Sequence, residues 1–233
     1  MRERYHLCSG LLESLPHVVS VLITAGSTRE QIDPIRHISS NSSGKQGYAL
    51  AECMGKIGWD VKLVSCPVSI VPRHDLYQTF YVNTSSDMLE TCLDLLPVDV
   101  AILTSAVTDW VPHYHNTKLK KNSVDRIEMM HSPDVAKCIS IDKNRPKLVI
   151  GFCLESENLI ESAKSKMAYK GCDWIIANYQ YVQDKEQAMG SDYNKIFIVT
   201  KDSVRPFEIM TKVEIAELIT EEIIDYLNGL DIT

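Results

Sequence analysis

The stretch Val18-Val19-Ser20-Val21-Leu22-Ile23-Thr24, which stops at Ala25-Gly26, decides the fold. A short run rich in β-branched apolar residues that ends in a loop is typical of a buried strand in a parallel sheet. Similar runs occur at residues 60–65, 79–82, 99–104, 147–152, 173–177 and 196–200. Segments with helical spacing lie between most of them, at 44–57, 85–96, 133–139 and 158–170, and another follows at 212–227. This alternation predicts right-handed crossovers and an α/β fold, a Rossmann-like and mainly parallel sheet covered by helices.

Residues 110–130 do not follow the alternation. They lack a helical period, contain a dense lysine cluster and finish in the alternating Arg126-Ile127-Glu128-Met129-Met130. This pattern predicts a flap with an antiparallel extension. Gly229 is expected to end the last helix. Because no linker or repeat divides the chain, we expect residues 18–233 to form a single domain after a poorly ordered leader at residues 1–17.

The composition excludes several classes of protein. The chain has 233 residues, of which 45% are hydrophobic and 24% charged, so it is neither disordered nor collagen-like. Lys and Arg number 24 against 31 Asp and Glu, and the net charge of −7 offers no overall field to attract nucleic acid. Apolar runs are too short for a membrane span, and we find no export signal. We therefore expect a protein with no nucleic-acid or membrane partner.

The cysteines indicate the compartment. Seven are scattered along the chain without a CxxC pair, which fits a reducing cytoplasm better than a disulfide framework. Cys153 follows a strand and is therefore open to two interpretations, a catalytic thiol or a buried small hydrophobe, and we favour the second.

Ligands of doubly wound sheets bind beyond the carboxyl ends of the strands, so the loops there are the first candidates for a site. After the first strand, Ser42-Ser43-Gly44-Lys45 opens the helix at 44–57. Such a start presents backbone N–H groups to an anion, although ordinary N-capping explains the same residues equally well. The segment matches neither GxGxxG nor GxxxxGK[ST], and no acid closes the second strand. A standard dinucleotide site is therefore disfavoured.

Two sets of lysines are further candidates. Lys118-Leu119-Lys120-Lys121 follows the strand at 99–104 and is either a solvated face or a phosphate clamp on the flap. Lys166 and Lys170 are spaced i,i+4, so both ammonium groups project to one side of their helix. The mild repulsion between the two ammonium groups is tolerable on a surface. It would also make sense if a triphosphate were bound between them.

Together these loops resemble the phosphopantothenate-cysteine ligase family. The resemblance is collinear over about residues 19 to 228 and is carried by Ile23-Thr24-Ala25-Gly26-Ser27-Thr28-Arg29-Glu30, Asp33-Pro34-Ile35-Arg36, Ser42-Ser43-Gly44-Lys45, Ala106-Val107-Thr108-Asp109, Lys118-Leu119-Lys120-Lys121, Ser132-Pro133-Asp134-Val135, Gly151-Phe152, Ile175-Ile176-Ala177-Asn178 and Gly190-Ser191-Asp192. Each piece is weak alone, but their order and spacing are specific.

The resemblance implies a reaction. Bacterial members use CTP and Mg²⁺, and no flavin: the carboxylate of 4'-phosphopantothenate attacks the α-phosphate, pyrophosphate leaves, and the amine of L-cysteine displaces CMP from the acyl-cytidylate. The product, 4'-phosphopantothenoylcysteine, is an intermediate of coenzyme A biosynthesis. The protein's tasks in such a reaction are charge neutralisation and positioning.

The resemblance also implies the residues of the site. The family's contacts with CTP fall on Thr104, Ser105, Asp109, Lys118, Pro133, Asp134, Val135, Ala136, Phe152, Lys166 and Lys170. Lys118, the first residue of the Lys-x-Lys-Lys motif, is expected to stabilise charge at the α-phosphate. The phosphate of phosphopantothenate is expected at Arg36, Ser42, Ser43, Gly44 and Lys45. The metal ligands are left open, although Asp109 is a candidate through water.

The sequence departs from the family at one catalytic position. Members usually carry an Asn, needed to turn over the acyl-nucleotide, before a variable residue and Ser-Ser-Gly. Here Ser40 occupies that place and Asn41 the variable one, so either Ser40 donates the hydrogen bond or Asn41 reaches in. We also expect a stand-alone ligase without the family's N-terminal flavin-dependent decarboxylase, and a homodimer formed through residues 111–130.

Two alternatives remain at this stage. A nucleotide-binding regulatory module with a decayed second half-reaction would explain Ser40. An NAD(P)-dependent reductase would explain the strand and helix alternation, but not the missing glycine fingerprint.

Overall fold

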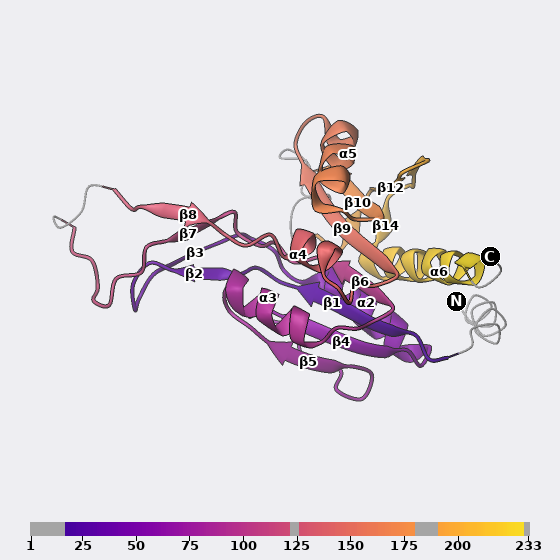
Figure 1. Ribbon diagram of the computed structural model, residues 1–233, viewed down its shortest axis with the longest axis horizontal. Helices are drawn as coiled ribbons and strands as arrows, with labels where there is room; N and C mark the ends of the chain where they lie inside the picture. Colours follow the sequence, from indigo (N-terminus) through magenta and orange to yellow (C-terminus); the bar gives the residue numbers. More distant parts are fainter. Residues whose placement is uncertain (1–16, 122–125, 180–190, 231–233) are drawn as a thin grey trace.

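An eight-stranded sheet forms the centre of the molecule (Figure 1). The computed structural model describes residues 17–121, 126–179 and 191–230, and residues 1–16 of the expected leader at 1–17 lie outside this part. In sheet order the strands are β13 (Val204–Pro206), β12 (Ile196–Thr200), β10 (Trp174–Tyr179), β9 (Leu148–Glu155), β6 (Val100–Leu103), β1 (Ser20–Ala25), β4 (Asp60–Ser65) and β5 (Gln78–Tyr81). Every neighbouring pair from β10 to β5 is parallel, and only the pairs β10–β12 and β12–β13 are antiparallel. The predicted mainly parallel sheet is confirmed.

The order of the strands locates the ligand crevice. From β1 the chain moves outward to β4 and β5, and it then returns to β6 on the other side of β1. This reversal makes the gap between the carboxyl ends of β1 and β6 the topological switch point, where doubly wound sheets bind their ligands.

Helices cover both faces of the sheet. They are α2 (Lys45–Lys56), α3 (Ser85–Asp94), α4 (Val135–Ile141), α5 (Leu159–Lys170) and α6 (Lys212–Leu230). Because side chains alternate along β1, Val21 and Ile23 pack under α2 and α6, whereas Leu22 packs with α3, α4 and α5. The two layers of helices therefore approach the switch point from opposite faces.

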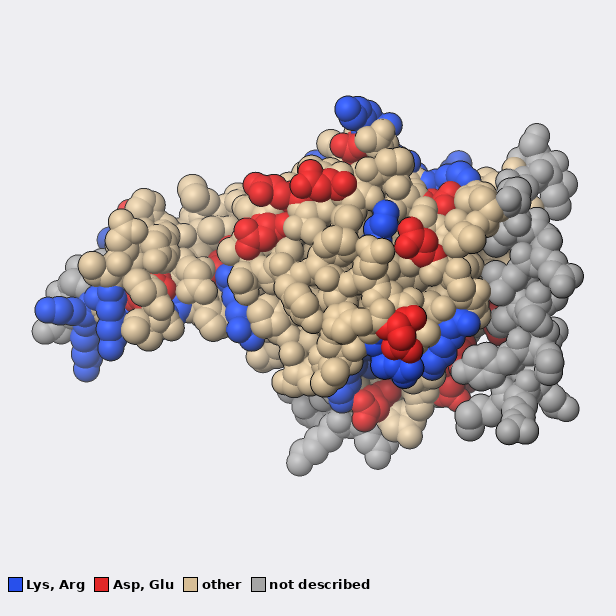
Figure 2. Space-filling model, turned by 90° about the horizontal axis from the view of Figure 1, so that it is seen from below, with Lys and Arg blue, Asp and Glu red and all other residues tan. Residues whose placement is uncertain are grey.

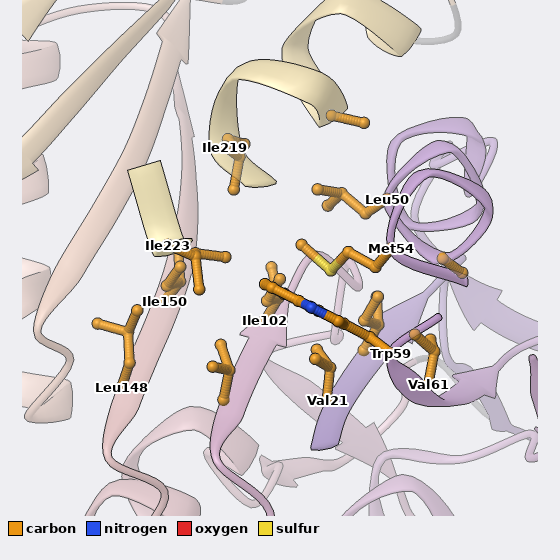
Figure 3. Packing of buried hydrophobic residues seen from close by; sticks show 14 of the residues in the cluster. Val21, Leu50, Met54, Trp59, Val61, Ile102, Leu148, Ile150, Ile219 and Ile223 are labelled. Carbon is orange, nitrogen blue, oxygen red and sulfur yellow. The ribbon is translucent and has the colours of Figure 1, made fainter. Parts of the chain in front are cut away.

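Figure 3 shows the core beneath α2 and α6. Ile219 and Ile223 from α6 and Leu50 from α2 meet the strand residues Ile102 and Ile150, and all five are fully buried. This packing holds the N-terminal ends of α2 and α6 next to each other, which matters for the site.

Two boundaries differ from the sequence predictions. The first strand begins at Ser20 rather than Val18, because Val18 is 64% exposed and precedes the sheet. The last helix continues through Gly229 to Leu230, so the predicted end at Gly229 is wrong. Gly229 does not adopt the positive φ of a helix-ending glycine.

A two-hairpin arm projects from the sheet (Figure 1). One hairpin is β7 (Trp110–Pro112) with β8 (Met129–His131), which confirms the predicted flap and antiparallel extension near residues 110–130. The other, β2 (Arg29–Gln31) with β3 (His37–Ser39), was expected to be a loop. A backbone hydrogen bond of 2.9 Å from His115 to Ile32 joins the two hairpins. No helix in the described part of the chain has the length and apolar character required to cross a bilayer.

Candidate active site

A cleft of about 780 Å³ opens at the carboxyl ends of β1, β6 and β9. Its lining combines the start of α2, the loop after β6, the segment before α4 and one side of α5. The lining residues predicted from the sequence are Ser40, Ser42, Ser43, Gly44, Lys45, Thr104, Ser105, Asp109, Pro133, Asp134, Val135, Ala136, Phe152, Lys166 and Lys170. The structure therefore gathers most of the predicted site in one cavity.

Hydrogen bonds tie the ends of β1 and β6 together at the floor of this cleft. The hydroxyl of Thr104 donates to the Thr24 carbonyl at 2.6 Å, and the Ser105 N–H donates to the Thr24 hydroxyl at 3.2 Å. The start of α2 packs closely on this junction, because a Cβ on Gly47 would lie 2.8 Å from the Thr104 hydroxyl oxygen. Only glycine permits such an approach without displacement of the helix.

The start of α2 has no side-chain cap. Gly44 adopts a positive φ of 75°, and the hydroxyls of Ser42 and Ser43 approach the N–H groups of Gly44 and Lys45 only at 3.4 and 3.5 Å. The N–H of Ser42 donates to the Ser27 hydroxyl at 3.0 Å, which holds Ser42 in place. Weakly satisfied N–H groups at a helix N-terminus favour an anion.

A buried carboxylate supports the loop that carries Asp109. Glu30 is only 2% exposed, and one of its oxygens accepts from the Ser85 N–H at 2.7 Å and from the Thr108 hydroxyl at 3.4 Å. The Thr108 N–H donates to the Thr28 hydroxyl at 3.0 Å. The loop after β6 is thus fixed by groups outside the cleft.

The α5 side of the cleft presents two paired lysines. Lys166 donates to Glu155 at 2.7 Å, and Lys170 donates to both oxygens of Asp134, which also caps α4 by accepting from Lys137 N–H at 3.1 Å. Burial lowers the pKa of Lys166, but the hydrogen bond with Glu155 and the interactions with the charges of Cys153 and Glu155 together outweigh it and hold this pKa above its ordinary value. Carboxylates therefore hold both ammonium groups in place at the cleft wall.

Three predicted residues do not line the cleft: Arg36, Asn41 and Lys118. Arg36 and Lys118 belong to the arm, where the fully buried Asp33 accepts from the Arg36 guanidinium and from the Leu119 N–H at 3.1 Å. Arg36 also donates to the Leu119 carbonyl at 3.0 Å. The hydrogen bond with Arg36 holds the pKa of Asp33 well below its usual range. Arg36 thus anchors the segment that carries Lys118.

Cys153 lies beneath the cleft rather than in it. Its side chain is only 1% exposed, and burial raises the pKa of its thiol. A buried thiol with a raised pKa is a poor nucleophile, so the favoured interpretation as a small hydrophobe agrees with the structure.

The cleft also contains residues that the sequence analysis did not select. They include Gln46, Tyr169, Asn178, Tyr193, Asn194 and Lys212. Asn178 was identifiable from its place at the end of a strand. Lys212 had a different signal, because a lysine on the first position of a helix opposes the helix dipole.

The described residues contain no cluster of three or more His, Cys, Asp or Glu side chains able to hold a metal ion. The two carboxylates of the described cleft lining are Asp134, which pairs with Lys170, and Asp109, which forms no ion pair with another described residue. A single carboxylate suits Mg²⁺, which often binds through one or two carboxylates, water and substrate phosphates.

The family follows from a comparison with known domains. Residues 17–227 match the model of the DNA/pantothenate metabolism flavoprotein C-terminal domain. The chain belongs to this family. The match confirms the resemblance to phosphopantothenate-cysteine ligases, because members of the flavoprotein C-terminal domain family include domains of that type.

Relatives and solved structures agree with this assignment. The coenzyme A biosynthesis bifunctional protein CoaBC of Borreliella burgdorferi is 36% identical over 84% of this chain and 50% of that protein. A crystal structure of the CoaBC C-terminal domain matches with a TM-score of 0.75 and 33% identity over 91% of this chain and 96% of that one. A mutant of Cab2 in complex with phosphopantothenate-cysteine shares the fold, with a TM-score of 0.68 and 15% identity over 97% of this chain and 90% of that one. The chain spans about half the length of the CoaBC proteins of Borreliella burgdorferi and Bacillus subtilis.

Proposed function

We propose that this domain joins 4'-phosphopantothenate to L-cysteine with CTP, forming 4'-phosphopantothenoylcysteine, CMP and pyrophosphate in coenzyme A biosynthesis. The observation that carries the proposal is one cleft at the β1/β6 switch point, which combines the uncapped start of α2 with Asp109, the start of α4 and two α5 lysines. The similarity to CoaBC proteins of coenzyme A biosynthesis supports it.

The α4 and α5 side of the cleft suits the nucleotide. Lys166 and Lys170 supply positive charge for the triphosphate, and the backbone of residues 133–136 supplies polar groups for the base. Mg²⁺, when bound, would screen the triphosphate, and Asp109 would hold it directly through a carboxylate oxygen or through water. Fixed cations near the phosphates lower the barrier because charge on them grows as pyrophosphate leaves. The reaction needs no flavin.

The α2 side suits the acid substrate. The N–H groups of Ser43, Gly44 and Lys45 favour an anionic group there, and the substrate would reach from this point to the α-phosphate of the nucleotide. Ser40 lines the cleft whereas Asn41 does not, which favours Ser40 as the hydrogen-bond donor in the step that transfers the acyl group to cysteine.

We further propose a homodimer in which arms from two copies pack together. The arm exposes large apolar side chains, among them Trp110 at 54% and Met130 at 63%. Figure 2 shows that most of the arm is uncharged on this face, with Lys and Arg gathered at its far end. An exposed apolar surface of this kind marks an interface. Lys118 does not line the cleft of its own copy. In such a dimer, the arm of one copy would bring Lys118 to the nucleotide bound by the other copy.

The cytoplasm is the proposed location. The six cysteines in the described part of the chain are free thiols, as a reducing compartment requires.

The decisive experiment combines the protein with 4'-phosphopantothenate, L-cysteine, CTP and Mg²⁺ and measures pyrophosphate and the condensed product. We expect both to form, and turnover with ATP in place of CTP to be much slower. Absence of pyrophosphate release contradicts the proposal. CTP binding without turnover, restored by Ser40→Asn, instead supports the regulatory module. Calorimetry with a nicotinamide cofactor tests the alternative of an NAD(P)-dependent reductase, and absence of binding excludes it.

A further inference from the structure

A single histidine lies in the described lining of the cleft, at the point where the arm joins the sheet. His131 is the last residue of β8 and pairs with Trp110 across the β7–β8 hairpin. The hydroxyl of the next residue, Ser132, donates to the Thr108 carbonyl, and the Thr108 N–H donates to the Thr28 hydroxyl at 3.0 Å. The backbone at His131 is therefore tied to the loop after β6.

The imidazole of His131 has no competing partner within the described part of the chain. None of these residues forms a hydrogen bond or an ion pair with it, and His131 is exposed at the rim of the cleft. Histidine accepts and releases a proton near neutral pH, and it is the side chain that most often acts as a general base. An unpartnered imidazole at the rim is available to a group that enters the cleft from solvent.

The other described groups of the lining that could take a proton are engaged or are weaker bases. Ammonium groups offer no lone pair, and those of the lining already donate to oxygen atoms: Lys45, Lys166, Lys170 and Lys212. The Asp134 carboxylate accepts from Lys170 and from the Lys137 N–H, and Asp109 is the residue proposed above for Mg²⁺. The tyrosines of the lining are phenols, which are far weaker bases than imidazole.

The second half-reaction of the proposed function calls for a base. An α-amino group is mostly protonated at neutral pH, and its nitrogen attacks an acyl carbon only through the lone pair that deprotonation frees. The acyl-cytidylate would occupy the cleft between α2 and α5, so L-cysteine would arrive last and from solvent. Its ammonium group would then meet the rim at which His131 is exposed.

We propose that His131 is the general base that deprotonates the ammonium group of L-cysteine for acyl transfer. An imidazole nitrogen accepts one ammonium proton, and the freed amine attacks the acyl carbon. The C–N bond forms, the bond from the acyl carbon to the CMP oxygen breaks, and CMP leaves with that electron pair. The amine nitrogen loses its second proton to solvent as the amide forms, and the imidazolium releases the first. This role rests on the proposed function and adds to it a residue outside the motifs that carry the family resemblance.

The test replaces His131 with glutamine, which keeps a hydrogen-bonding side chain but is not basic. The full chain receives CTP, Mg²⁺ and 4'-phosphopantothenate, with either L-cysteine or hydroxylamine as the nucleophile. A positioned general base contributes about 100-fold to 10,000-fold in rate, so we expect His131→Gln to slow product formation from L-cysteine by at least about 100-fold. Pyrophosphate release in the first turnover should be unchanged. Hydroxylamine needs no base, because its nitrogen is largely unprotonated at neutral pH, and it should trap the acyl-cytidylate as the hydroxamate at the wild-type rate. Added imidazole should restore turnover with L-cysteine to His131→Ala.

His74→Gln is the matched control, because His74 is exposed in the loop between β4 and β5 and does not line the cleft. It should match the wild type in every one of these measurements. Wild-type product formation from L-cysteine in His131→Gln, an equal loss with hydroxylamine, or an equal loss of pyrophosphate release overturns the role of His131. Wild-type turnover still upholds the proposed function in each of those cases. A wild-type chain that releases no pyrophosphate overturns both.

Discussion

Asp134 holds Lys170 through both carboxylate oxygens, at 2.9 and 3.0 Å, across the gap between α4 and α5. The ammonium group is thereby fixed at the cleft wall before any ligand binds. In the proposed function, a triphosphate would share a cation whose position is already set, so less ordering of the Lys170 side chain would be needed on binding.

Lys170→Met should weaken CTP binding by about 10-fold to 100-fold, because one charged hydrogen-bond donor is lost. Affinity for 4'-phosphopantothenate should change little. Lys164→Met on the same helix is the control, since Lys164 is exposed and lies outside the cleft lining. Titration calorimetry measures both affinities. An unchanged CTP affinity in Lys170→Met would show that the triphosphate binds elsewhere.

Ser40→Ala should slow formation of the condensed product by about 100-fold, the usual effect of removing one donor that stabilises developing charge. Pyrophosphate release in the first turnover should persist, because that step does not use Ser40. Asn41→Ala, at a residue outside the cleft lining, should stay near wild type. Rapid-quench measurement of pyrophosphate and product separates the two steps. Greater loss with Asn41→Ala than with Ser40→Ala would reverse the assignment.

Trp110→Asp with Met130→Asp should convert the proposed homodimer to a monomer, since two charges would be placed on the exposed apolar surface of the arm. Val71→Asp is the control, because Val71 is also exposed, at 83%, but lies in the loop between β4 and β5. Sedimentation velocity reports the mass. A wild-type chain that sediments as a monomer at all concentrations argues against the dimer.

Gly47→Ala should destabilise the fold by about 1–3 kcal/mol, as overpacking of a tight contact does. Its Cβ would lie 2.7 Å from the Ala25 Cβ and 2.8 Å from the Thr104 hydroxyl oxygen. Gly229→Ala supplies the contrast, because a Cβ there meets no atom within 4 Å and the residue is helical. That change should stabilise by about 0.5–1 kcal/mol. Urea unfolding measures both, and equal effects would contradict the argument.

Asp99 should make stability depend on pH in the acid range. Burial by itself raises the pKa of Asp99, but hydrogen bonds from Ser20, His17 and Lys147 outweigh it and hold this pKa well below its ordinary value. A depressed folded-state pKa contributes stability above the unfolded value of about 3.9 and loses it as pH falls toward the folded value. Asp99→Asn should therefore cost about 1–2 kcal/mol at pH 7, less below about pH 4. A difference in unfolding free energy that stays constant from pH 7 to pH 3 would refute this.

The sheet was predictable from sequence because its signal is local. β4 lies where its β-branched run predicts, and the loops after β1 and β6 meet because parallel strands end at one edge of a sheet. The hairpin of β2 and β3 was missed, since its three-residue strands are too short to show a period and depend on Asp33. The side-chain carboxylate of Asp33 accepts from the N–H groups of Ile35 and Arg36, each at 2.9 Å, which sets the turn.

The placement of charged residues was harder to predict. Arg36 and Lys118 belong to the motifs of the family, yet the structure places both on the arm. The geometry of the arm depends on contacts between segments far apart in the sequence. One example is the hydrogen bond from Arg36 to the carbonyl of Leu119, at a sequence separation of 83. Lys212 was overlooked because its spacing fits an ordinary amphipathic helix, and its place in the cleft lining depends on the packing of α6 beside α2.

One oxygen of Glu30 accepts both from the first turn of α3 and from Thr108. Because both donors share this oxygen, an opening that displaces Glu30 releases both of them, and the amide hydrogens of these two segments should exchange with solvent as one cooperative unit. Local opening at the start of α3 would then reach the Asp109 side of the cleft without any movement of the sheet.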